Sequence, residues 1–107
     1  MGEVVEQNHK EAVEWFTKSA QQNNAYAQHA LGKCYQKGEG VQQNPKQAFD
    51  WFAKSSKQGN PLAHYELGLC YLNGNGVRQN NNAARHWFFK AATLGHEDAK
   101  NTLASWS

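Results

Sequence analysis

Apolar residues recur along the chain at helical spacing, in runs that are separated by glycine and asparagine. In the middle of the chain, four such positions fall at i, i+3, i+4 and i+7, which is the pattern of one helix face: Ala48, Trp51, Phe52 and Ser55. Asn44 is a good N-cap and Pro45 suits the first helical position. These residues predict a helix over residues 45–57.

A second helix follows after the break at Gly59-Asn60-Pro61. Its packing face, at the same kind of spacing, consists of Ala63, Leu67, Cys70 and Tyr71. Gly74 is placed to end this helix as a C-terminal cap, and Gly76 allows the chain to turn before Val77 returns to the core. The pattern therefore predicts a second helix over residues 61–72.

The helix pair is a repeat unit. Residues 5–40 and 41–76 share 18 identities in 36 positions, and the spacing continues into a third, truncated unit. Self-similarity at this period is typical of a solenoid. We therefore predict an all-α fold in one domain, residues 1–107: an α-solenoid of about three 36-residue helix pairs, or about six antiparallel helices, with units at 5–40, 41–76 and 77–107. The equivalent aromatic pairs are Trp15-Phe16, Trp51-Phe52 and Trp87-Phe88, and we expect Trp51 to be a central anchor.

Composition limits the function. Only 39% of the residues are hydrophobic and the mean hydropathy is -0.87, but the chain has four Trp, four Tyr and five Phe. A net charge of +2 with the basic residues spread along the chain argues against a dedicated nucleic-acid binder. No apolar run has the length of a membrane span, and the first residues do not resemble a signal peptide.

Catalytic and metal-binding patterns are lacking. The glycines of residues 38–40 recur with the repeat and precede neither a dinucleotide fingerprint nor a Walker loop. Cys34 and Cys70 occupy equivalent places in successive units, too far apart for a disulfide, so we expect free thiols packed as small hydrophobic groups. The five histidines have no metal-ligand spacing and are expected on the surface or in a groove. We predict no enzyme activity, no cofactor and no metal.

The motif A-x-x-W-F-x-K-(S/A)-(S/A)-x-x-G, followed by A-x-x-x-L-G-x-C-Y-x-x-G-x-G-V-x-Q-N, resembles the Sel1-like repeat family of the tetratricopeptide-like class. The resemblance implies a right-handed α-solenoid that holds proteins or peptides together and performs no reaction. It favours a bacterial envelope or secreted location, should a signal segment lie outside these residues. It also places the second helix of each pair along a concave groove.

The second helix of the middle unit has an additional apolar stripe opposite its packing face: Leu62, Tyr65, Leu69 and Leu72. The equivalent positions of the other units are polar or mixed, and include Tyr26, His29, Lys33 and Asn101. Such a stripe is either a binding surface or a site of mutual packing between adjacent helices. We expect a groove that binds a protein or peptide partner. The alternative is a spacer from a longer scaffold, without a ligand. Self-association is expected to be absent or weak, through uncapped repeat ends.

A ladder of lysines, Lys18, Lys54 and Lys90, also follows the period. These ammonium groups could meet an acidic peptide or a nucleic-acid backbone. The simpler interpretation, which we favour, is a solvated edge on which the lysine stems cover the aromatic rings.

Overall fold

The structure is a computed structural model that describes residues 2–106, with side chains described for residues 6–106. Val5, a member of the repeating valine series, lies outside the described side chains. The described part of the chain consists of six helices and no strand. The helices are α1 (Gly2–Gln21), α2 (Ala25–Lys37), α3 (Pro45–Lys57), α4 (Pro61–Asn73), α5 (Asn81–Thr93) and α6 (Glu97–Ala104).

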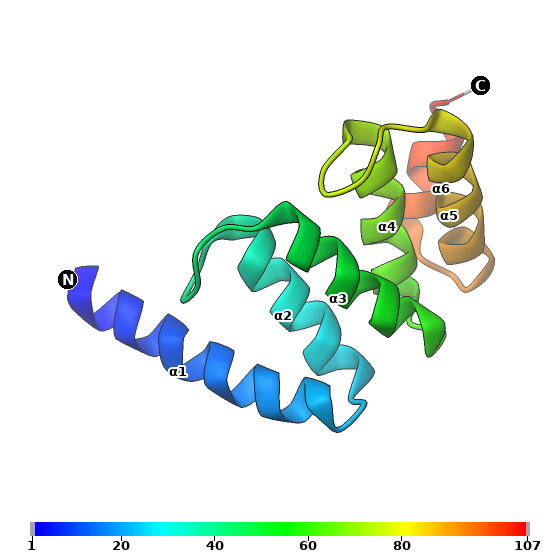
Figure 1. Ribbon diagram of the computed structural model, residues 1–107. Helices are drawn as coiled ribbons and strands as arrows, with labels where there is room; N and C mark the ends of the chain where they lie inside the picture. The colour runs from blue at the N-terminus through cyan, green and yellow to red at the C-terminus, as the bar shows by residue number, and fades with distance from the viewer. Residues whose placement is uncertain (1, 107) are drawn as a thin grey trace.

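The helices stack in chain order into an elongated body of 45 × 25 × 23 Å. Figure 1 shows the two ends of the chain at opposite ends of this stack, as expected for a solenoid. Consecutive helices are neighbours throughout, and the most extensive packing joins α2 to α3 and α4 to α5. The all-α solenoid predicted from the sequence is confirmed.

Local chemistry explains the helix ends. The Asn44 side chain accepts a hydrogen bond from the N–H of Gln47, and Pro45 begins α3. Gly74 caps α4 in the left-handed conformation, with φ 69°, and donates its N–H to the Cys70 carbonyl. Helix α3 has the predicted bounds, and α4 ends one residue later than predicted.

The second glycine of each loop allows a close approach of two backbones. Gly40 and Gly76 both have positive φ, of 76° and 75°. A Cβ atom at Gly76 would collide with the carbonyl of Pro45, and one at Gly40 with the carbonyl of His9. Val77, next in the chain, is half-buried against the core between α3 and α4. Gly74 therefore ends α4, and Gly76 directs the chain toward the next helix, as the repeat predicted.

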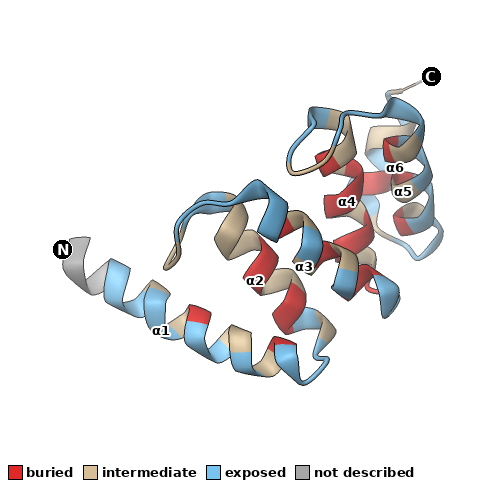
Figure 2. Cartoon of the chain, viewed as in Figure 1, coloured by how far each residue is buried: buried red, intermediate tan, exposed pale blue. Residues whose placement is uncertain are grey.

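The core is built on phenylalanine rather than tryptophan. Phe52 and Phe88 are both 0% exposed. Each ring lies on a glycine of the preceding even-numbered helix, because a Cβ on Gly32 would be 2.6 Å from Phe52 Cε1, and one on Gly68 would be 2.5 Å from Phe88 Cε1. Figure 2 shows the buried positions concentrated in α2, α3 and α4, whereas few of the described residues of α1 are buried.

The expectation that Trp51 is a central anchor was wrong. Its side chain is only half-buried and lies at the edge of the α1–α2 core. The Lys54 ammonium lies 4.5 Å from the centre of the Trp51 ring, and Lys90 lies 5.1 Å from Trp87. Lys54 and Lys90 thus cover aromatic rings, as the simpler interpretation of the lysine ladder predicted.

Candidate binding face of the even-numbered helices

Side chains of the even-numbered helices meet across the repeat boundaries. Lys33 of α2 places its Nζ 3.0 Å from Oε2 of Glu66 in α4. Tyr65 of α4 stacks on His96, the N-cap residue of α6, with ring centres 4.6 Å apart. The successive even-numbered helices are therefore joined by direct contacts along one side of the stack.

The side formed by the odd-numbered helices is more open. A hollow of about 470 Å³ lies between the end of α1 and the last turns of α3, and Trp51, Lys54 and Lys57 line its α3 wall. The described side chains thus make contacts between successive helices on the even-numbered side, whereas the odd-numbered side is hollowed between α1 and α3.

The predicted site residues all lie on helices α2, α4 and α6, and we call the surface that they form the even-helix face. Tyr26, Leu62 and Asn101 are exposed, with exposed fractions of 74% for Tyr26 and 39% for Leu62. The remaining residues of the predicted site are half-buried: His29, Lys33, Tyr65, Leu69 and Leu72.

Glu66 is the residue of this face that the sequence reasoning missed. Its side chain is buried, and Oε2 accepts no hydrogen bond of good geometry from the described residues although Lys33 Nζ is 3.0 Å away. Lys33 and Glu66 therefore form an ion pair, and His29 Nε2 lies 3.9 Å from the same oxygen. Glu66 follows Leu62 by four residues, so the helix period places it beside the apolar stripe but does not reveal that it is buried.

His29 is an uncharged neighbour of this ion pair at neutral pH. Burial lowers the pKa of His29 below its usual 6.5, and this effect exceeds the opposing influence of the Glu66 carboxylate. The imidazole also packs against Phe52, with ring centres 5.7 Å apart. The polar part of the face is therefore a neutral imidazole beside a compensated ion pair.

Tyr65 contributes to packing. Besides stacking on His96, its ring lies 5.5 Å from the centre of the Phe88 ring. The interpretation of the stripe as mutual packing between helices thus fits Tyr65. Leu62 and Tyr26 are more exposed and present more of their surface to solvent.

His64 contradicts the expectation that all histidines lie on the surface or in a groove. It is buried, its Nδ1 is 2.7 Å from the Ser56 hydroxyl, and its ring stacks on Trp87 at 5.5 Å. Burial lowers the pKa of His64 below 6.5, and Lys90 adds to the shift. Tertiary packing of α4 on α5 encloses this side chain, which sequence spacing could not reveal.

The two thiols are free, as predicted. Burial raises the pKa of Cys34, and burial together with the Glu66 charge raises that of Cys70 to about 12. A thiol of this kind is a poor nucleophile at neutral pH. Within residues 6–106, no three His, Cys, Asp or Glu side chains gather in a way that could hold a metal ion. Among the described helices, none combines the length and apolar character of a transmembrane segment.

Solved structures of bacterial repeat proteins are similar to this chain. A protective antigen of uropathogenic Escherichia coli with an SLR fold, c5321, is 33% identical, with a TM-score of 0.86 over 88% of this chain and 20% of its own. A Sel1 repeat protein of Oxalobacter formigenes is 37% identical, with a TM-score of 0.77 over 78% of this chain and 63% of its own. Cysteine-rich protein B of Helicobacter pylori is 27% identical, with a TM-score of 0.79 over 84% of this chain and 68% of its own.

The chain thus spans a fifth of the Escherichia coli antigen and just under two thirds of the Oxalobacter protein. The comparison with curated proteins gives no match. The sequence model of the Sel1 repeat matches residues 1–24, 25–60 and 61–96. Its full repeats therefore begin at α2 and α4, one helix later than the repeat units that we predicted from the sequence. Proteins with such repeats are typically interaction modules and generally non-enzymatic scaffolds. By its period, its helix pairs and this match over most of its length, the chain belongs to the Sel1 repeat family.

Proposed function

We propose that the even-helix face binds a peptide or an exposed segment of a partner protein. The observation that carries the proposal is the exposure of Tyr26 and Leu62 on a surface whose polar groups are already fixed in place by the Lys33–Glu66 ion pair. Aromatic and apolar residues beside ordered polar groups are the usual composition of an interface centre.

The apolar side chains of the face and its Lys33–Glu66 ion pair would have different roles. Leu62, with the half-buried Leu69 and Leu72 beside it in the stripe, would take apolar side chains of the partner. The Lys33 ammonium is about one third exposed, so it retains donors for a partner carbonyl or carboxylate while Glu66 holds it in position. Because Glu66 compensates the charge of Lys33, the selectivity would come mainly from hydrogen-bond geometry rather than from net charge.

The proposal can be tested by selecting binders from a random peptide library displayed on phage and measuring their affinity by isothermal titration calorimetry. Tyr26→Ala and Leu62→Ala should each weaken binding by about tenfold, which corresponds to about 1.4 kcal/mol. Phe89 and Leu94 are similarly exposed, at 61% and 56%, but lie on α5 and at its C-cap. Phe89→Ala and Leu94→Ala are therefore matched controls and should leave the affinity unchanged.

Tyr65→Ala is a poorer test, because its ring also contacts Phe88 and His96 and its loss should lower stability. If the peptides instead bind more weakly to the Phe89→Ala and Leu94→Ala variants, the binding surface lies on the odd-numbered helices. If the library yields no binder, the spacer function becomes the better interpretation, and the packing of Tyr65 between α4 and α6 is the observation that favours it.

A further inference from the structure

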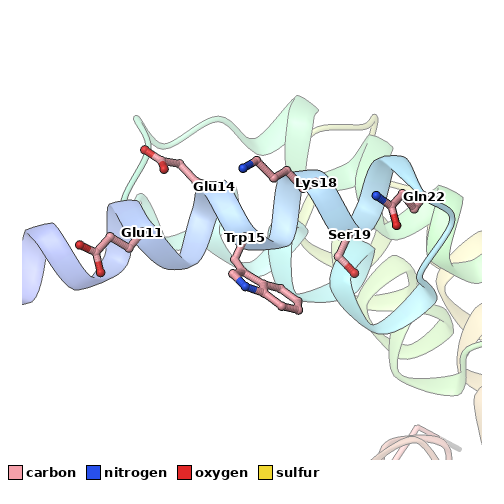
Figure 3. Close-up of a pocket in the computed structure, with 6 residues that line it drawn as sticks. All are labelled: Glu11, Glu14, Trp15, Lys18, Ser19 and Gln22. Atoms are coloured by element: carbon pink, nitrogen blue, oxygen red, sulfur yellow. The ribbon is translucent and has the colours of Figure 1, made fainter.

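The outer side of α1 resembles an interface without a partner. Trp15 is 71% exposed, whereas its equivalents Trp51 and Trp87 are half-buried against the preceding helices. A hollow of about 490 Å³ lies on this side of α1, and Figure 3 shows its lining residues along the helix. They are Glu11, Glu14, Trp15, Lys18, Ser19 and Gln22.

Two of these positions, those of Ser19 and Gln22, lie at an occupied interface one repeat later. On α3, the Ser55 hydroxyl donates a hydrogen bond of 2.7 Å to the carbonyl of Ala25, and Gln58 Nε2 donates one of 2.9 Å to Gln28 Oε1. The α1 residues one period earlier than Ser55 and Gln58 are Ser19 and Gln22.

Helix α5 does not keep this set, because it has Ala91 and Leu94 at the two positions. The α1 segment therefore carries the Trp, Phe, Ser and Gln residues that the α3 segment has at its junction with α2.

The other end of the stack offers the surface that such an interface needs. The positions of α6 that correspond to Ala25 and Gln28 of α2 are Glu97 and Lys100, and both are exposed. The Glu97 carbonyl would accept from Ser19, and the Lys100 ammonium would donate to the side-chain oxygen of Gln22.

Several residues of α6 differ from their α2 equivalents, and one of these differences affects the contact with the phenylalanine ring. Where Gly32 receives Phe52, α6 has Ala104. Its methyl group would press on Phe16, the α1 equivalent of Phe52, as a Cβ on Gly32 would press on Phe52 at 2.6 Å. Phe16 is only half-buried, so its ring can shift, but the contact should be weaker than the internal one.

From these equivalences we propose that α6 of one copy docks on the outer side of α1 of a second copy, and so continues the solenoid between molecules. The contact is heterologous, because two different surfaces meet. Since it repeats the operation that relates neighbouring repeats, each copy adds to the end of a row and the association does not close at a dimer.

Sedimentation velocity of the purified chain over micromolar to millimolar concentrations tests this proposal. The mean mass should rise with concentration beyond that of a dimer. Trp15→Ala should abolish the rise, and Ala104→Leu should do the same from the opposite end. Ala104→Gly restores the glycine and should increase the association constant about tenfold. Phe89→Ala, at an exposed aromatic residue outside both surfaces, should change nothing.

A mixing experiment fixes the polarity of the contact. The Trp15→Ala chain keeps an intact α6 surface, and the Ala104→Leu chain keeps an intact α1 surface. Each should be monomeric alone, and the mixture should give one-to-one heterodimers and nothing larger. Circular dichroism checks that both variants remain folded, which their exposed positions favour.

Two results would overturn the proposal. One is a monomer for the unmodified chain at every concentration. The other is a dimer that Trp15→Ala disrupts but Ala104→Leu does not, since that pattern means that two α1 helices pair with each other.

Discussion

The two most extensive helix junctions of the stack, α2–α3 and α4–α5, share one packing contact and differ in the residues around it. In both, a fully buried phenylalanine ring lies on a helix glycine, Phe52 on Gly32 and Phe88 on Gly68. At the first junction hydrogen bonds surround the ring, from Ser55 to a backbone carbonyl and between two glutamine side chains.

The second junction lacks those bonds. Ala91 replaces the serine, and the space of the glutamine pair is taken by His64, whose ring stacks on Trp87. The repeat therefore requires the ring and the glycine, because their shapes set the distance between the helices. The neighbouring positions can be polar or aromatic as long as their buried polar atoms find partners.

The largest expected effect concerns the shared ring. Phe52→Ala should lower the free energy of unfolding by about 3–5 kcal/mol, because it leaves a cavity between α2 and α4. Trp51→Ala should cost clearly less, since Trp51 is half-buried, and Trp15→Ala should stay within about 0.5 kcal/mol. Urea denaturation followed by circular dichroism measures all three. If Trp51→Ala and Phe52→Ala lower the free energy of unfolding equally, Trp51 is a central anchor of the core after all.

The shared glycine should be the next most sensitive position. Gly68→Ala improves helix propensity by about 1 kcal/mol, but its methyl group would lie 2.5 Å from a ring atom of Phe88. We expect a net loss of about 1–3 kcal/mol in thermal or urea unfolding. Ala104→Gly, at the exposed equivalent position that ends α6, should lose at most the helix-propensity difference of about 1 kcal/mol. A stabilised Gly68→Ala chain would show that the ring tolerates the methyl group.

The hydrogen bonds of the first junction provide a third test. Ser55→Ala removes the donor to the Ala25 carbonyl and the acceptor for Asn60 Nδ2, which lies 2.9 Å from the hydroxyl. The loss should be about 1–3 kcal/mol, because Ser55 and Asn60 are both buried. Ser19→Ala changes the equivalent residue on the outer side of α1 and should leave the unfolding midpoint of the dilute chain unchanged. If both variants unfold at the same midpoint, the serine bond does not stabilise the first junction.

The smallest expected effect is a pH dependence of folding stability that His64 gives to the second junction. The pKa of His64 is lowered below 6.5 in the folded chain. At pH values between the lowered pKa and 6.5, the unfolded chain therefore binds more protons than the folded chain. Stability from this group is therefore complete above about pH 6.5 and decreases as the pH falls through the lowered value.

His64→Gln introduces the residue that the first junction has at this place, as Gln28, and should reduce the slope of stability against pH. His29, whose pKa is also lowered, should account for the slope that remains. Urea unfolding at a series of pH values from 7 to 5 measures the slope, and an unchanged slope in the variant would exclude His64 as a source.

The helix ends could be predicted because they depend on neighbours in the chain. Asn44 with Pro45 begins α3, and Gly74 ends α4, through contacts within a few residues. The repeat was visible for the same reason. The candidate face was predicted as a set of positions, since residues on one side of a helix follow from its period.

The choice between Trp51 and Phe52 as the core residue was decided only by tertiary structure. Both fall on the apolar side of α3, about 100° apart around the helix axis, and only the position of α2 determines which of them meets Gly32. The burial of Glu66 has the same origin, because its charge is compensated by Lys33 from another repeat. The sequence by itself determined the period, the helix ends and the sides of each helix. The tertiary structure decided which side chains lose contact with water, because burial depends on helices that are distant in the chain.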